Sequence, residues 1–443
     1  MNNSLAKNHS LASLFAFALP SMVVMIFLSL YTIVDGIFIS RFVSTTALSA
    51  TNIVYPIISL ELGISIMIGT GGSAIISKQM GEGKEALAKS TFTALVILEF
   101  SIGVVLAILG NLFLDPLVLA LGATEAQFQL CKDYSSLLLA FAPCFFLQTG
   151  FQLLFVTAGR PGLGLVVTVI AGILNMVLDY VFMVPFGMGI TGAALATVIG
   201  YSFSAVVGVI HFSFFRKKSL LNFVKPHISR HDLLHTLSNG SSEMVANLST
   251  AVTTYLLNLV FLDFFKEDGV AAITIALYFQ FVFTSLFIGF STGVAPIVGY
   301  KYGEKNAPQL HKLLQNSLVI IGSCTLLMYI LSLAAIRLVL SVFTPAHSLV
   351  YDIALKGFPL FSLSFLLMPV NIFASAWFTA LSNGKISALL SFARTFLFLV
   401  GSILLLPRFF HVPGAWAAIS VAETAGIILS LYCLRRYKSH YQY

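Results

Sequence analysis

Long apolar runs, separated by short polar or glycine- and proline-marked breaks, follow one another along the whole chain. Because a helix rises about 1.5 Å per residue, about 20 apolar residues span a hydrocarbon core of about 30 Å. Twelve of the runs reach that length. We therefore expect twelve transmembrane helices, near residues 14–39, 47–76, 91–114, 134–158, 162–183, 189–214, 236–262, 270–299, 315–340, 353–381, 386–410 and 412–432.

The runs do not alternate between polar and apolar residues, as the short strands of an outer-membrane barrel would. The run from Val96 to Leu109, for example, is broken only by Glu99, Ser101 and Gly103. The first run, Leu11 to Ile39, is too long for a signal-peptide core. The expected fold class is an all-α integral membrane protein.

Composition excludes a water-soluble protein. Hydrophobic residues make up 58% of the 443 residues, charged residues only 9%, and the mean hydropathy is +0.96. Soluble domains carry about 25% charged residues.

The basic residues indicate the orientation. If the N-terminus is cytoplasmic, the inside segments hold 17 of the 24 lysines and arginines. Positive residues favour the cytoplasmic side, so we expect both termini in the cytoplasm and the chain in the inner membrane. The net charge of +7 then faces the anionic leaflet and requires no nucleic acid partner.

The chain repeats itself at an offset of 222 residues. Gly81-Glu82 recurs as Gly303-Glu304, and Gly192-Ala193 recurs as Gly414-Ala415. Six spans separate the equivalents, so the halves share one orientation and a pseudo-two-fold axis along the membrane normal. The expected domains are a six-helix lobe at 1–215, a basic cytoplasmic linker at 216–235, which holds Arg216, Lys217 and Lys218, and a second six-helix lobe at 236–443.

The sequence contains no motif for ATP hydrolysis, for a redox or zinc site, or for catalysis. No G-x-x-x-x-G-K-[ST] motif occurs, so we expect no ATP-hydrolysing domain that would drive transport. The four cysteines show no C-x-x-C spacing, and we expect no cofactor. An intramembrane enzyme would need a His/Asp or metal constellation, but His227, His231 and His235 lie in or near the linker. A two-lobed single chain also fits a passive channel poorly.

Ionisable residues inside the spans are candidates for function, because each costs about 2.5–3.5 kcal/mol to insert. Seven lie there: Asp35, Glu61, Glu99, Asp179, Glu243, Arg394 and Glu423.

Two of these acids should lie at one depth. Asp35 and Asp179 come near the outer ends of their spans, and Thr197 lies in the outer half of the next span. Asn175 precedes Asp179 by one helical turn. We expect a common pocket that holds one proton or one Na⁺ at Asp35, Asp179 and Asn175. The alternatives are an Asp35 that snorkels to the surface and an Asn175–Asp179 pair that only bonds helices together.

The other acids leave two interpretations open. Glu99, Glu243 and Arg394 fall in the inner third of their spans, where a buried ion pair is as consistent as a substrate site. Glu61 and Glu423 lie nearer the midplane and are candidates for substrate or ion binding. The 40 phenylalanines suit cation-π recognition of lipophilic cations, although most membrane phenylalanines pack or face lipid.

The sequence resembles the bacterial branch of the multidrug and toxic compound extrusion (MATE) family along nearly its whole length. The resemblance rests on motifs in the expected order: Ala18-Leu19-Pro20, Val34-Asp35-Gly36-Ile37-Phe38-Ile39, Gly71 through Gly81-Glu82, Ala158-Gly159-Arg160-Pro161, Leu174-Asn175-x-x-x-Asp179 and Gly192-Ala193-Ala194-x-Ala196-Thr197.

The resemblance implies an antiporter that expels organic, often cationic compounds in exchange for H⁺ or Na⁺. It places the coupling ion at Asp35, Asn175, Asp179 and Thr197. Two departures stand out: Gln148 or Gln152 replaces a family asparagine on the fourth span, and Glu243 falls about two turns before the acid that some branches use.

We expect small organic substrates, a bilayer environment and a monomer. The rival transporter is a flippase for a lipid-linked oligosaccharide. It should have a strongly basic cavity, whereas only Arg394 lies deep in a span.

Overall fold

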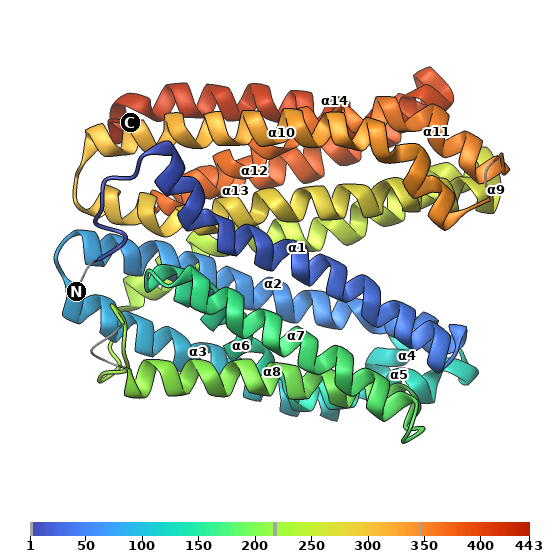
Figure 1. The fold of residues 1–443 in the computed structure, drawn as a ribbon, viewed down its shortest axis with the longest axis horizontal. Helices are drawn as coiled ribbons and strands as arrows, with labels where there is room; N and C mark the ends of the chain where they lie inside the picture. The colour runs from blue at the N-terminus through green and yellow to red at the C-terminus, as the bar shows by residue number, and fades with distance from the viewer. Residues whose placement is uncertain (1–2, 216–218, 346) are drawn as a thin grey trace.

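The computed structural model describes residues 3–215, 219–345 and 347–443. It is a bundle of long helices that run parallel and antiparallel to one common direction (Figure 1). The first half contains α1 (Leu11–Phe42), α2 (Thr45–Gly81), α3 (Glu85–Leu112), α4 (Leu114–Ala120), α5 (Glu125–Ala140), α6 (Ala142–Thr157), α7 (Pro161–Met183) and α8 (Gly189–Phe214). The second half contains α9 (Arg230–Gly303), α10 (Ala307–Phe343), α11 (Leu349–Ser362), α12 (Ser364–Ala380), α13 (Gly384–Phe392), the π-helix η2 (Ala393–Val400) and α14 (Gly401–Tyr441).

Two of these elements are helical hairpins. A continuous helix of 74 residues, the length of α9, would measure about 110 Å, far more than a bilayer. The backbone leaves helical geometry at Lys266 in α9 and at His411 in α14, where φ is 57° and 51°. Each therefore supplies a turn between two spans.

Two other spans are bent. α5 and α6 meet at 59°, next to Pro143, and α11 and α12 meet at 46°. Counting each bent pair as one span and each hairpin as separate arms gives twelve spans in the described part of the chain, as expected.

The expected linker, residues 216–235, overlaps the first turns of α9. α9 begins at Arg230, because the Ser229 side chain caps it by accepting a hydrogen bond from the Asp232 N–H at 3.0 Å. The first turns of α9 can hold charged residues because they come before the apolar run that begins near residue 236. The basic residues Arg216, Lys217 and Lys218 lie outside the described residues.

The helices form two lobes, α1–α8 and α9–α14 (Figure 1). The lobes approach one another at the end that holds both chain termini, here called the terminal end, and their ribbons diverge toward the opposite end. α1 starts beside the second lobe and crosses to the first, packing against both α9 and α7. The expected two-lobed helical fold is confirmed.

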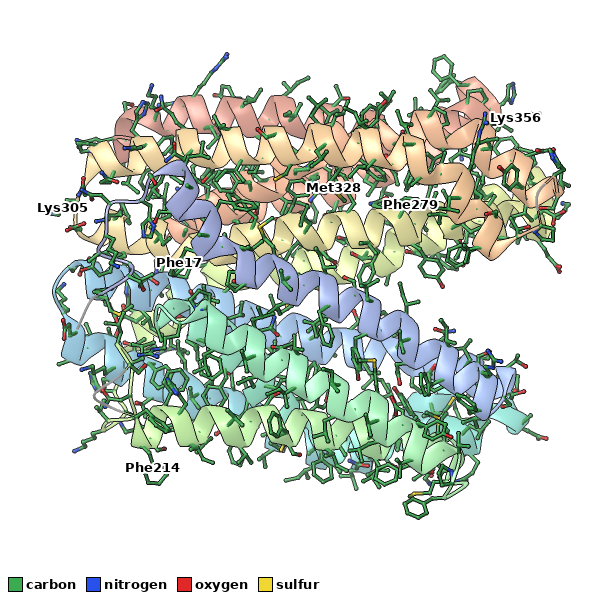
Figure 2. The ribbon with its side chains drawn as sticks, in the orientation of Figure 1. Phe17, Phe214, Phe279, Lys305, Met328 and Lys356 are labelled. Carbon is green, nitrogen blue, oxygen red and sulfur yellow. The ribbon has the colours of Figure 1, made fainter. Side chains whose placement is uncertain are left out.

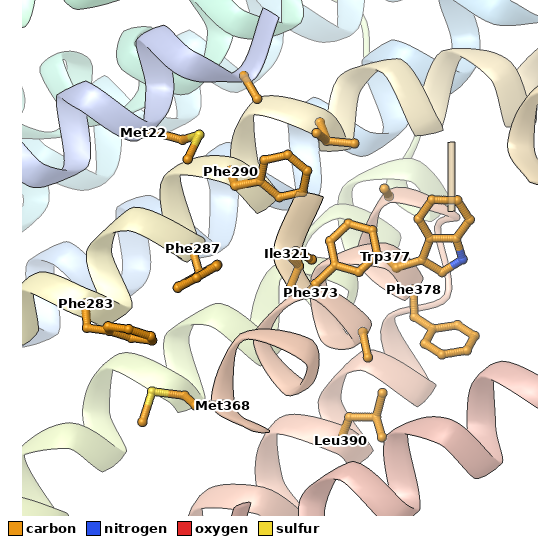
Figure 3. Packing of buried hydrophobic residues seen from close by; sticks show 14 of the residues in the cluster. Met22, Phe283, Phe287, Phe290, Ile321, Met368, Phe373, Trp377, Phe378 and Leu390 are labelled. Atoms are coloured by element: carbon orange, nitrogen blue, oxygen red, sulfur yellow. The ribbon is translucent and has the colours of Figure 1, made fainter. Parts of the chain in front are cut away.

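Aromatic side chains fill the second lobe. The Phe283 ring stacks on Phe365 at 4.5 Å, and Phe373 lies 5.7 Å from Trp377. Met22 of α1 joins the same cluster, so the core continues from one lobe into the other (Figure 3). By contrast, Phe214 is 80% exposed and points away from the bundle (Figure 2). Such outward apolar side chains suit a lipid environment.

Glycines let the lobes touch at the terminal end, and they do so symmetrically. A Cβ atom on Gly81 would overlap the Tyr300 carbonyl, and one on Gly303 would overlap the Lys78 carbonyl. Gly81 and Gly303 are 222 residues apart, and so are Lys78 and Tyr300. Each contact is therefore the image of the other under a two-fold axis between the lobes.

The N-terminal segment, residues 3–10, also connects the lobes at this end. The Ser4 hydroxyl donates to the Gly159 carbonyl at 3.1 Å in the first lobe. Lys301 of the second lobe donates to the Ala6 carbonyl at 2.7 Å and pairs with Glu304 at 2.8 Å. Lys301 is only 1% exposed, so its ammonium group depends on these partners.

Candidate functional site

Asp35 of α1 and Asp179 of α7 lie together in the first lobe. The two carboxyl groups interact electrostatically. Two buried carboxylates repel each other, so the pair favours a bound proton or cation. Asp179 is fully buried.

Close packing of α1 on α7 brings the two acids together. A Cβ atom on Gly172 would overlap the Phe27 ring, so only glycine permits this approach of the helices. Asp35 and Asp179 follow this contact by about two turns on their respective helices. The close approach of the two helices places both acids in the same region of the first lobe.

Asn175 lies one turn before Asp179 on α7 and is joined to Thr197 of α8. Asn175 is 1% exposed, and its amide donates to the Thr197 hydroxyl at 3.2 Å, which in turn donates to the Ala193 carbonyl at 3.0 Å. The interhelical hydrogen bond therefore joins Asn175 to Thr197 of α8. The amide nitrogen faces α8, and the amide oxygen is left without a donor.

Four buried oxygens in this pocket have no hydrogen-bond donor among the described residues: Asp35 Oδ1, Asp179 Oδ1, Asp179 Oδ2 and Asn175 Oδ1. Buried acceptors without donors are costly, so the arrangement favours a bound proton or a cation. Carboxylate and amide oxygens suit hard cations. The donor set therefore fits H⁺ or Na⁺, while no cluster of three His, Cys, Asp or Glu side chains that could hold a metal occurs in the described chain.

Three tyrosines around the acid pair escaped the sequence analysis. Tyr31, Tyr134 and Tyr201, from α1, α5 and α8, all interact electrostatically with Asp35. For two of them, Tyr31 and Tyr201, the spacing in the sequence already indicated the site. Tyr31 precedes Asp35 by four residues, and Tyr201 follows Thr197 by four, which places each on the face of its helix that carries the site.

Glu61 is linked to this site by Tyr201, which interacts electrostatically with both Glu61 and Asp35. Its side chain is 5% exposed, Oε1 has no partner among the described residues, and its charge acts on Tyr201. The Gln148 Oε1 atom is buried and likewise has no partner within the described chain. For Gln152, no side-chain contact to the acid pair is recorded in the described part of the structure.

Glu99 is buried apart from this pocket. It is 1% exposed, and both carboxyl oxygens lack a partner among residues 3–215, 219–345 and 347–443. Its carboxyl group lies against α6 at Gly150, where a Cβ atom would overlap it. The hypothesis that Glu99 belongs to a buried ion pair is therefore not supported by the described contacts.

Arg394 forms a buried ion pair, but its partner is Glu423, which the sequence makes a candidate for substrate or ion binding, and not Glu99 or Glu243. Arg394 Nη2 lies 2.8 Å from Glu423 Oε1, Nε donates to both carboxylate oxygens, and Asn371 donates to Oε2 at 2.7 Å. Glu423 is 2% exposed. The Arg394 guanidinium neutralises the charge of Glu423, and the cluster ties η2 and α12 to α14.

Glu243 lies near the contact between the lobes. It is half-buried in α9 and interacts electrostatically with Arg394. Its neighbour Met244 packs against Gly63 of α2 in the first lobe. Glu243 and Glu423 belong to the second lobe, whereas Asp35 and Asp179 belong to the first.

The second lobe has no copy of the acid pocket. At the offset of 222 residues, the positions that match Asp35, Asn175, Asp179 and Thr197 are Leu257, Leu397, Gly401 and Ile419. The lobes share a fold but not this chemistry.

Comparison with known proteins gives one family. The sequence model of the MatE family matches residues 20–181 and again residues 243–404, once in each half of the chain.

Named relatives are transporters. The chain is 23% identical to the multidrug export protein MepA of Staphylococcus saprophyticus over 95% of this chain and 93% of that protein. It is 30% identical to an FAD transporter of Shewanella oneidensis, over 42% of this chain and 41% of that protein.

Solved structures share the whole fold. A crystal structure of a MATE protein in complex with MaL6 has a TM-score of 0.94 and 21% identity, covering 100% of this chain and 99% of that chain. An outward-facing multidrug resistance MATE transporter has a TM-score of 0.93 and 22% identity over the same shares.

Proposed function

This chain belongs to the MatE family of multi-pass membrane transporters, and we propose that it exports lipophilic organic cations from the cytoplasm in exchange for H⁺ or Na⁺. The observation that carries the proposal is the set of four buried, donor-free oxygens at Asp35, Asp179 and Asn175. In this proposal these oxygens form the reversible cation site that ion coupling needs.

The coupling follows from competition for charge. A cationic substrate and a coupling ion both favour the same negative pocket, so each lowers the affinity of the other by an equal factor. In this proposal the terminal end is cytoplasmic, as the distribution of basic residues favours. The coupling ion then enters from the opposite end, toward which the lobes diverge, and its binding drives release of the substrate.

The substrate class follows from the distribution of charge. An anionic substrate such as FAD, which the Shewanella relative carries by its name, would need free basic groups among the spans. Arg394, the arginine deep in a span, is bound by Glu423. The same observation argues against a flippase for a pyrophosphate-linked oligosaccharide. Acids and aromatic rings suit organic cations better.

The test is transport by purified protein in liposomes, with H⁺ and Na⁺ gradients imposed separately. Efflux of a lipophilic cation should follow one of these gradients in the wild-type chain. Asp115→Asn is the matched control, because Asp115 is an exposed acid paired with Lys132 outside the pocket. An efflux rate that does not depend on either gradient would refute the proposed antiport.

A further inference from the structure

Glu99 of α3 is a buried acid that the proposed antiport does not use. Its carboxyl group lies between α2 and α6: a Cβ atom on Gly150 would overlap it, and one on Gly69 would lie 3.7 Å from Oε1. Glu99 is 1% exposed, and neither carboxyl oxygen has a hydrogen-bond partner among the described residues. Because a larger side chain at position 150 would occupy this space, glycine there leaves room for the carboxyl group.

No neighbouring charge compensates this acid. α3 packs against α2, α4, α5 and α6, whose buried titratable side chains are Glu61 of α2 and Cys131 and Tyr134 of α5. No charged group on these helices acts on Glu99 within the described chain. An ionised carboxylate that is buried without a cation or a donor is far more costly than a neutral one. The surroundings of Glu99 therefore favour a carboxyl group that carries a proton.

A polar row on α2 passes this carboxyl group. Four buried residues follow one another at intervals of four positions and so share one face of the helix: Glu61, Ser65, Gly69 and Ser73. The Glu99 carboxyl group lies beside Gly69, the one position of the four that offers no side chain. The row thus continues from Glu61 past Glu99 to Ser73.

The row lies between the acid pocket and the terminal end. On the side of the pocket, Tyr201 interacts electrostatically with both Glu61 and Asp35. On the other side, the hydroxyl groups of Ser73 and Thr157 lie 2.7 Å apart, and α6 ends at Thr157, near the docked N-terminal segment. Hydroxyl and protonated carboxyl groups both donate and accept hydrogen bonds, so they suit the passage of a proton.

The second lobe does not repeat this row. At the 222-residue offset, Glu61, Ser65, Ser73 and Glu99 correspond to Phe283, Phe287, Ala295 and Ile321. Phe283 and Phe287 belong to the hydrophobic core of that lobe (Figure 3). Gly150 corresponds to Ile372, whose side chain would fill the space that the carboxyl group takes in the first lobe. Since both lobes share one architecture, the fold itself does not require an acid at position 99.

We propose that Glu99 is a second proton-binding site of the first lobe, and that it passes the coupling proton between the acid pocket and the terminal end. The carboxylic acid releases its proton toward the terminal end and becomes a carboxylate. It then takes up the proton of the Asp35–Asp179 pair, so Glu99 is neutral again. The relay rests on the proposed antiport with H⁺ as the coupling ion, whereas the binding of a proton at Glu99 does not.

Infrared spectroscopy of the purified full chain tests the proton on Glu99. At about pH 7.5 exposed acids are ionised, so the carbonyl band of a protonated carboxylic acid reports buried acids. Glu99→Gln should lose one such band. Asp115→Asn is the control and should lose none, because Asp115 is exposed and paired with Lys132. A Glu99→Gln spectrum that keeps every band of this kind would overturn the proposal.

A second pair of variants tests the geometry without removing the acid. Gly150→Ala places a Cβ atom where the Glu99 carboxyl group lies, so it should shift the same infrared band. Gly162→Ala is the matched control, because a Cβ atom there meets nothing within 4 Å. An equal spectrum in both variants would contradict the placement of the proton at Glu99.

Proteoliposomes test the relay. Glu99→Gln should lose efflux of ethidium driven by an H⁺ gradient, because the amide cannot pass the proton on. It should keep the exchange of labelled for unlabelled ethidium without a gradient, since the acid pocket is intact and no net proton movement is needed. A merely structural role of Glu99 would reduce efflux and exchange alike, and that result would overturn the relay.

The two proposals fail in different ways. Unchanged H⁺-driven efflux in Glu99→Gln, or wild-type efflux that follows a Na⁺ gradient alone, would overturn the relay and leave the antiport standing. Wild-type efflux that follows neither gradient would refute the antiport and the relay together. The infrared band then still decides whether Glu99 binds a proton.

Discussion

Asp35 and Asp179 should act as one unit, because their carboxyl groups interact electrostatically and a single proton or cation would neutralise the pair. Asp35→Asn and Asp179→Asn should each reduce gradient-driven efflux by about tenfold or more, while the double variant loses little beyond either single change. The measurement is efflux in proteoliposomes, normalised to inserted protein. Losses that multiply in the double variant would show two independent sites.

The Arg394–Glu423 pair has a structural role that can be separated from transport. Arg394→Met should destabilise the protein by about 3 kcal/mol, because it leaves the buried Glu423 without its cation. Arg394→Met/Glu423→Gln should recover much of that loss. Thermal unfolding in detergent measures both, and Lys132→Met, in an exposed pair, should change little. A double variant no more stable than Arg394→Met would contradict this role.

Among the connecting elements, the N-terminal segment should respond to pH through His9. The imidazole is buried and hydrogen bonds to the Ser4 carbonyl and the Ser13 hydroxyl. Burial, reinforced by the positive charge of Lys301, lowers the pKa of His9 below its ordinary 6.5. Above that ordinary value both docked and undocked segments carry a neutral ring. As the pH falls below it, the undocked segment binds protons more readily, so docking weakens.

This dependence can be read from a reporter on the segment. In a cysteine-free background, Asn8→Cys should react with a thiol reagent roughly threefold faster at about pH 5.5 than at about pH 7.5, after correction for free thiol reactivity. His9→Asn should remove the dependence, because asparagine does not titrate in this range. A dependence that persists in His9→Asn would assign it to another group.

At the scale of the whole molecule, the glycine contacts should decide how fully the lobes close at the terminal end. Gly81→Ala and Gly303→Ala each place a Cβ against a backbone carbonyl of the other lobe, so the closed arrangement should be disfavoured. Spin labels at Lys84→Cys and Lys312→Cys, one in each lobe, should report a population with longer distances. Gly322→Ala and Gly401→Ala are matched controls, because a Cβ there meets nothing within 4 Å. Unchanged distances in Gly81→Ala would refute this role of the glycines.

The sequence by itself determined the number of spans, the two-fold repeat and the depth of the acids, because hydrophobic length and spacing act locally along the chain. It predicted a common site for Asp35, Asp179, Asn175 and Thr197 from the same spacing, and that site remains a prediction. Depth alone does not fix which helix faces which, and so only the tertiary structure decided that Arg394 pairs with Glu423 rather than with Glu243 or Glu99.

The docking of residues 3–10 likewise needed the tertiary structure. It depends on packing between elements far apart in the sequence, such as Ala6 with Lys301. Side-chain contacts of this kind leave no period in the sequence, because each partner is set by the orientation of two helices about their own axes.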